Sequence, residues 1–109
     1  MFHIDDESRW SMVLSNVKNL LNEVSQDEIE IEVLGNGNSV KKYVADPKND
    51  YTDLMKDLAD KNVKFAACNN SLNGMKLKKE DLNSFVSVVP AGVLELIEKQ
   101  REGYAYIKP

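Results

Sequence analysis

The chain has 109 residues, of which 42% are hydrophobic and 29% are charged, and its net charge is −4. This size suits one core, so we predict a single globular domain over residues 1–109. The acidic balance argues against a general binder of phosphate backbones, because the densest basic run, Lys76, Lys78 and Lys79, is followed at once by two acidic residues. We expect no nucleic-acid partner.

No apolar stretch approaches the roughly 18 residues that a membrane-spanning helix needs. The first seven residues include three acidic ones, which is unlike a signal peptide. A single cysteine cannot form an intramolecular disulfide, and this suits a reducing compartment. We therefore expect a cytoplasmic protein that does not associate with membranes.

The first half of the chain predicts strand, helix and strand. Residues 2–4 form a short apolar run, and an amphipathic helix of about four turns follows, its apolar residues recurring at spacings of three and four: Trp10, Val13, Leu14, Val17, Leu20, Leu21 and Val24. Residues 28–34 alternate as a strand does, but Glu28, Glu30 and Glu32 share one face. A strand covered by helices on both sides rarely carries such a face, so we expect it to be partly open, or covered by charged groups or another subunit.

The second half continues the alternation. Gly35-Asn36-Gly37 predicts a turn, because it lacks the third glycine and the Lys-Ser/Thr of phosphate-binding loops. Further expected elements are short helical segments at 39–44, 71–75 and 79–82, helices from about 52 to 61 and from Pro90 to Gly103, and strands at 63–67, 85–89 and 104–107. Strands that alternate with helices favour an α/β fold with a mostly parallel sheet.

The only cysteine, Cys68, follows the strand at 63–67 and precedes small polar residues that can open a helix. In a parallel sheet this junction lies at the carboxyl edge, where ligands usually bind. Free N–H groups and the positive end of a helix dipole favour the thiolate, which is the reactive form. The alternative is that Cys68 is a small buried apolar residue of the core.

The other candidate residues also have structural explanations. Asn69, Asn70 and Ser71 can donate hydrogen bonds to a sulfur or an anion, and equally can cap a helix. The only histidine, His3, ends the first strand and can lie near Cys68, although a structural hydrogen bond explains it as well.

Gly92 follows the strand at 85–89 and precedes a helix, so its N–H can help to bind an anion at the same edge; close packing alone also explains a glycine there. One Cys and one His cannot form a structural zinc site, and the carboxylates are scattered, so we expect no metal and no cofactor.

In order along the chain, four segments resemble the DsrE/DsrF-like family of small α/β proteins. They are the opening strand Phe2-His3-Ile4-Asp5, the strand-plus-cysteine element Asn62 to Leu72, the turn Val88-Val89-Pro90-Ala91-Gly92-Val93, and the entry to the last strand, Lys99 to Ile107. The likeness covers essentially the whole chain. It implies a three-layer α/β/α sandwich with a five-stranded, mainly parallel sheet, and assembly into trimers or hexamers.

The resemblance also implies a chemistry. In sulfur-oxidising members of the family the corresponding cysteine carries a persulfide and passes sulfane sulfur to a partner protein, and Cys68 matches that position. Our first hypothesis is a sulfur carrier or sulfurtransferase-like protein, with Cys68 as the nucleophile and Asn69, Asn70 and Ser71 around it. The second is a non-catalytic oligomeric module that binds a small ligand or a protein in the same cleft, with Cys68 merely lining it.

Overall fold

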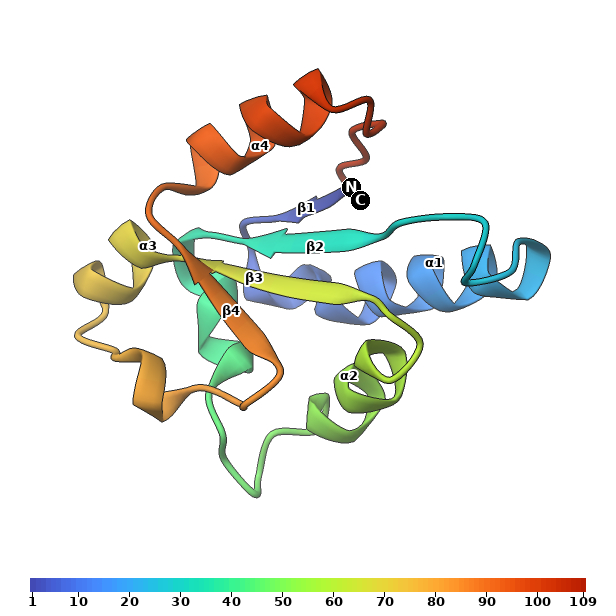
Figure 1. Ribbon diagram of the computed structural model, residues 1–109. Helices are drawn as coiled ribbons and strands as arrows, with labels where there is room; N and C mark the ends of the chain where they lie inside the picture. The colour runs from blue at the N-terminus through green and yellow to red at the C-terminus, as the bar shows by residue number, and fades with distance from the viewer.

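Four parallel strands form one sheet, in the order in which they occur along the chain: β1 (Phe2–Ile4), β2 (Glu32–Gly35), β3 (Lys64–Cys68) and β4 (Val86–Val89) (Figure 1). The computed structural model describes all of residues 1–109. Its register pairs Ile4 with Gly35, Gly35 with Ala67, and Cys68 with Val89. The carboxyl ends of all the strands therefore meet at one edge of the sheet.

Helices lie on both sides of this sheet. The α-helices are α1 (Trp10–Glu23), α2 (Thr52–Ala59), α3 (Asn69–Gly74) and α4 (Gly92–Arg101), and the 3₁₀ helices are η1 (Glu7–Arg9), η2 (Gly37–Tyr43) and η3 (Lys79–Asp81). Figure 1 shows α1 and α2 on one side of the sheet, α4 on the other, and α3 beyond the carboxyl ends of the strands. None of the helices has the length and apolar character to cross a membrane.

The main core lies between the sheet and α1, η2 and α2. Successive strand residues alternate between the two faces, and Phe65 joins this core while its neighbour Ala66 faces the other way. Trp10 and Tyr43 pack edge to face with ring centroids 5.1 Å apart, and Tyr43 continues the contact to Phe65. The indole N–H of Trp10 donates to the carbonyl of Ser39 at 2.8 Å, so its buried polar atom is satisfied.

On the α4 side, the face with three glutamates is partly open, which is one of the alternatives expected. The strand itself begins only at Glu32; Glu28 and Glu30 precede it and are exposed. The hydroxyl of Tyr104 donates to Glu30 at 2.9 Å. Glu32 is only 4% exposed, and burial, followed by the neighbouring Glu95 of α4, raises its pKa to about 7.

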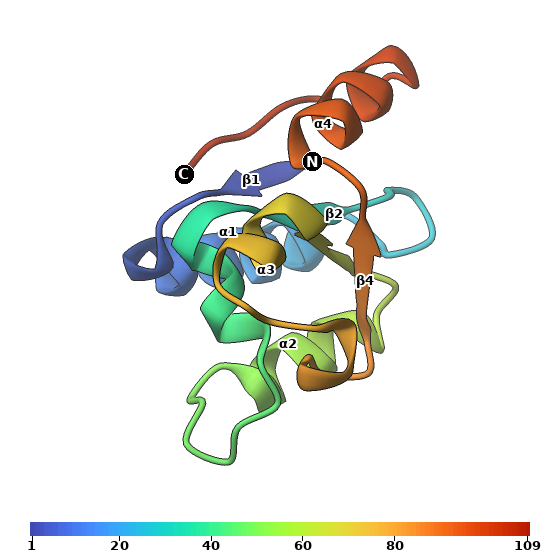
Figure 2. The same ribbon diagram turned by 90° about the vertical axis from the view of Figure 1, so that its left-hand side faces the viewer.

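The prediction of a fifth strand at 104–107 is wrong, and the sheet has four strands rather than five. α4 does lead the chain back to β1, and Figure 2 shows the C-terminal segment running alongside β1. There, Ile107 forms a single parallel bridge with Phe2, through the bonds His3 N–H to Ile107 O at 2.9 Å and Ile107 N–H to Met1 O at 2.8 Å. The ladder does not extend because β1 is three residues long and Pro109, near the bridge, has no N–H.

The three-layer arrangement stays a prediction. On the α4 side Leu96 packs against a small cluster made of Met1, Leu34 and Ala66. Lys64 and Ser87 flank Ala66 on that same side and are exposed, because α4 does not reach over them. One face of the sheet is thus fully covered and the other is covered in part.

Candidate functional site

Cys68 is the last residue of β3 and precedes the first residue of α3. The three residues before it are buried and apolar, and its backbone is extended, with φ −71° and ψ 119°. The small polar residues that follow allow the chain to turn directly into a helix. Cys68 is a free cysteine and only 5% exposed, so its sulfur lies just below the surface of the carboxyl edge.

Backbone donors converge on the sulfur of Cys68. The N–H of Gly92, the first residue of α4, donates to Sγ at 3.2 Å. Burial by itself raises the pKa of the Cys68 thiol, but hydrogen bonds from the N–H groups of Ser71, Gly92 and Asn70 and from the Ser71 hydroxyl outweigh it. The pKa of Cys68 therefore lies below its ordinary value, and the geometry stabilises a thiolate in a nearly closed setting.

The turn after β2 holds Ser71 in place. The N–H of Gly37 donates to the Ser71 hydroxyl oxygen at 2.8 Å, which leaves the hydroxyl proton free to point at Cys68. Gly37 has a φ of +58°, and a side chain there would begin 2.9 Å from the carbonyl oxygen of Asp5. Only glycine fits this position, so the direct connection from β2 to η2, which supports the cysteine site, depends on Gly37.

His3 lies at the same edge but does not contact Cys68. Its Nε2 is 2.9 Å from Oδ1 of Asn36, and its Nδ1 is 2.6 Å from the hydroxyl of Tyr106. Asn36 follows the last residue of β2, and β2 separates β1 from β3 in the sheet. Both nitrogens of His3 are therefore engaged, and a direct role as a base for Cys68 has no geometric support.

The remaining predicted residues lie around Cys68 in different ways. The side chains of Asn69 and Asn70 are exposed at the rim, and Asn70 reaches the sulfur only through its N–H. Gly92 is buried, and a Cβ added to it would lie 3.3 Å from Cys68 Cβ and 3.5 Å from both Sγ and the Cβ of Asn36. The lack of a side chain at Gly92 thus lets the start of α4 pack directly against Cys68.

Three residues near this edge were not predicted from the sequence as part of the site: Asn36, Gly37 and Tyr106. The signal for the first two was available, because β2 is a parallel strand beside β3 and its carboxyl end must come next to Cys68. The sequence indicated only a turn at residues 35–37, whereas in the structure Gly35 ends β2, Gly37 begins η2, and this connection is part of the site. No sequence pattern predicted that Tyr106 would lie beside His3, because its position depends on the path of α4 across the sheet.

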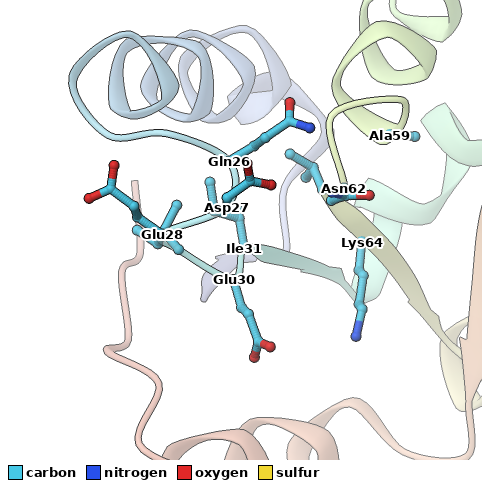
Figure 3. A pocket seen from close by; sticks show the side chains of 10 residues that line it. Gln26, Asp27, Glu28, Glu30, Ile31, Ala59, Asn62 and Lys64 are labelled. Carbon is cyan, nitrogen blue, oxygen red and sulfur yellow. The ribbon is translucent and has the colours of Figure 1, made fainter.

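A pocket is also present away from Cys68. It has a volume of about 750 Å³ and is lined at the amino ends of β2 and β3 by residues that include Asp27, Glu30, Asn62 and Lys64 (Figure 3). Figure 3 shows Glu30 and Lys64 extending to the same side of the sheet. This pocket is at the opposite end of β3 from Cys68. No three His, Cys, Asp or Glu side chains are grouped so that they could hold a metal ion.

The comparisons with known proteins agree with this architecture. The model of the DsrE/DsrF-like family matches residues 5–109. No curated protein matches the chain. Among solved structures, the chain is similar to MTH1491, a protein of unknown function from Methanobacterium thermoautotrophicum, with a TM-score of 0.89 and 35% sequence identity over 99% of this chain and 96% of the other. The match spans nearly the whole sequence, and the chain therefore belongs to the DsrE/DsrF-like family.

Proposed function

We propose that this protein carries sulfane sulfur as a persulfide on Cys68. The observation that supports this most directly is the hydrogen bond from the Gly92 N–H to Cys68 Sγ at 3.2 Å, made together with the donors of Ser71. Donors aimed at sulfur stabilise the thiolate, which is the form that attacks a sulfur donor. Membership of the DsrE/DsrF-like family suggests a sulfur-relay role in general.

The proposed loading step needs no metal and no cofactor. With thiosulfate as donor, the Cys68 thiolate attacks the sulfane sulfur, an Sγ–S bond forms, and the bond between sulfane sulfur and the sulfonate group breaks. Sulfite leaves with the electron pair of that bond, so the step is Cys68–S⁻ + S–SO₃²⁻ → Cys68–S–S⁻ + SO₃²⁻. A second protein would then accept the outer sulfur. A reducing, cytoplasmic setting would keep Cys68 free of disulfides.

Intact-mass spectrometry tests the loading step. The native protein, incubated with thiosulfate or with polysulfide and then freed of excess reagent, should gain the mass of one sulfur atom. Cys68→Ser, the matched control, should gain none. Equal addition to both proteins would assign the modification to another group, and no addition with either donor would contradict the proposed function.

A second function is favoured by the burial of Cys68, which is only 5% exposed. In this alternative the protein is a non-catalytic module that binds a small ligand or a protein at the carboxyl edge, and Cys68 only lines the site. The mass experiment separates the two, since a lining cysteine has no need to accept sulfur. A thiol that resists both sulfur donors and alkylating reagents in the folded protein would favour this module.

We also propose that the protein is a homo-oligomer, a trimer or a hexamer. Three apolar side chains on α4 are well exposed: Val93 at 64%, Leu94 at 48% and Ile97 at 45%. Here they are called the α4 stripe. Helices of soluble monomers rarely leave such a group uncovered, and burial of it between copies would remove apolar surface from water. The stripe begins beside Gly92, so a neighbouring copy on it would stand close to Cys68.

A further inference from the structure

A chain of hydrogen bonds crosses the carboxyl edge and ends beside Cys68. Tyr106, His3 and Asn36 make it, with distances of 2.6 Å from Tyr106 Oη to His3 Nδ1 and 2.9 Å from His3 Nε2 to Asn36 Oδ1. An amide oxygen only accepts hydrogen bonds, so Nε2 of His3 must carry the proton. In the neutral ring Nδ1 then accepts from the Tyr106 hydroxyl, and the direction of the whole chain is fixed.

This direction determines which end of the Asn36 amide is free. Oδ1 is occupied by His3, while the amide nitrogen makes no hydrogen bond with the protein and is not a buried unpaired atom. The side chain of Asn36 is half-buried between the β1 and β3 sides of the edge. Asn36 therefore presents a donor, held in orientation by two further residues, at the edge where Cys68 lies.

Asn36 and the sulfur of Cys68 both lie beside Gly92. The position that a Cβ on Gly92 would take is 3.5 Å from Asn36 Cβ and 3.5 Å from Cys68 Sγ. The start of α4 thus packs closely against both side chains, and the N–H of Gly92 is directed at Sγ. An outer sulfur, bonded to Sγ at the ordinary S–S distance of about 2 Å, would come within reach of the Asn36 amide if it extended toward that side.

Persulfide formation moves the negative charge from Sγ to the outer sulfur, which the hydrogen-bond donors around Sγ do not reach. In the thiolate the charge lies on Sγ, where Gly92 and Ser71 stabilise it. After the sulfane sulfur is bound, Sγ is a neutral bridging atom and the charge lies on the outer sulfur. A charge that appears during a reaction is stabilised best by a donor already oriented toward its new position.

From this arrangement we infer that Asn36 contacts the substrate: its amide nitrogen donates a hydrogen bond to the outer sulfur of the Cys68 persulfide. His3 and Tyr106 are positioning residues that keep the oxygen of Asn36 away from the sulfur and its nitrogen toward it. The inference rests on the proposed function, because it concerns the sulfur that Cys68 receives. From the sequence alone, Asn36 was expected only as part of a turn.

Asn36→Asp is the decisive variant. A carboxylate still accepts from His3 Nε2 and has nearly the same shape, so the hydrogen-bond chain is retained, but the donor toward sulfur is replaced by an acceptor. Loading of Cys68 by thiosulfate is followed by intact mass against time, in the native protein, Asn36→Asp and Tyr106→Phe. The rate of alkylation by iodoacetamide against pH, measured in parallel, gives the thiolate fraction of each protein and corrects for any change in it.

Per thiolate, Asn36→Asp should load sulfur roughly tenfold to a hundredfold more slowly, which is what the loss of one hydrogen bond to a charged group produces. Tyr106→Phe, a milder change on an exposed side chain, should lower the rate several-fold and leave the alkylation profile unchanged. If the native protein loads sulfur and both variants load at the native rate, the inference is wrong and the proposed function stands. If Asn36→Asp does not fold, Tyr106→Phe alone decides in the same way. Failure of the native protein to load at all overturns both.

Discussion

The N–H of Gly92 donates to the sulfur of Cys68 at 3.2 Å, so the first residue of α4 is bonded to the last residue of β3. The segment that follows β3 and the segment that follows β4 therefore meet at this bond. Any shift of α4 relative to the sheet changes the hydrogen bond to the sulfur and, with it, the balance between thiol and thiolate. Gly92 also has to lack a side chain, since a Cβ would lie 3.3 Å from that of Cys68.

Gly92→Ala should raise the pKa of Cys68. The added methyl group must displace either α4 or the cysteine by a few tenths of an ångström, and the bond from N–H to Sγ lengthens. The pH at which alkylation reaches half its maximal rate should move upward by about one unit, the size of a weakened hydrogen bond to a charged group. Gly74→Ala is the control, because nothing lies within 4 Å of a Cβ there. Equal profiles for the two variants would contradict the role assigned to Gly92.

In the native protein, alkylation of Cys68 should show a midpoint clearly below the unperturbed thiol value of about 8.5. The reason is the set of donors from Ser71, Gly92 and Asn70, which together outweigh burial. The measurement is the rate of iodoacetamide labelling between pH 5 and pH 10, with labelled peptide identified by mass. The thiolate is partly enclosed, so the maximal rate should be lower than that of the unfolded chain. A midpoint at or above 8.5 would remove the argument for a nucleophile.

Some strand boundaries could be predicted from the sequence and others could not. The position of Cys68 at the end of β3 followed from local patterns alone, because a buried run and a polar helix start are both short-range signals. The start of β2 could not be predicted in this way, because residues 28–31 alternate like a strand although β2 begins only at Glu32. The segment at 104–107 has strand-like composition, yet its pairing depends on how much of β1 is there to pair with.

The same distinction applies to the site. Ser71 and Gly92 were predictable because Ser71 lies in the first turn of the helix after β3 and Gly92 opens the helix after β4. The hydrogen-bond chain from Tyr106 through His3 to Asn36 joins residues separated by up to 103 positions. Such contacts arise from the path of the whole chain, and no local pattern indicates them. His3 was correctly expected at this edge, but its partner is Asn36 and not Cys68.

Glu32 should make the stability of the protein depend on pH. Its carboxyl is buried beside Glu95, so its pKa is raised from 4.5 to about 7 in the folded state. The folded protein then holds a proton that the unfolded chain has released, and the free energy of unfolding falls as the pH rises from about 4.5 to about 7. Glu32→Gln removes this titration and should be about 3 kcal/mol more stable than the native protein at pH 8, with little difference at pH 4.5.

Urea unfolding at a series of pH values measures this effect. Glu28→Gln, on the exposed residue that precedes the strand, serves as the control and should keep the native pH profile. If Glu32→Gln shows the same fall in stability between pH 4.5 and pH 7 as the native protein, the titrating group is elsewhere. A loss of stability at every pH would mean that the carboxyl is stabilised as an ion, in contrast to the geometry described.

The α4 stripe should mediate self-association. Light scattering coupled to size exclusion should report a mass of three or six times the 12.3 kDa monomer. Val93→Asp should shift the mass toward the monomer and leave the melting temperature of the fold nearly unchanged, because Val93 is 64% exposed. Met12→Asp, at a similarly exposed apolar residue of α1, is the control and should retain the native mass. A monomer at all micromolar concentrations would contradict the oligomer.

The central claim is that Cys68 both accepts and gives up one sulfur atom, and cyanolysis measures this most directly. Protein loaded with thiosulfate and freed of excess reagent is treated with cyanide, which takes the outer sulfur as thiocyanate and returns the Cys68 thiolate. The account predicts one thiocyanate per chain from the native protein, none from Cys68→Ser, and return of the native protein to its unloaded mass. Thiocyanate in equal amounts from both proteins, or none from the native protein, would contradict it.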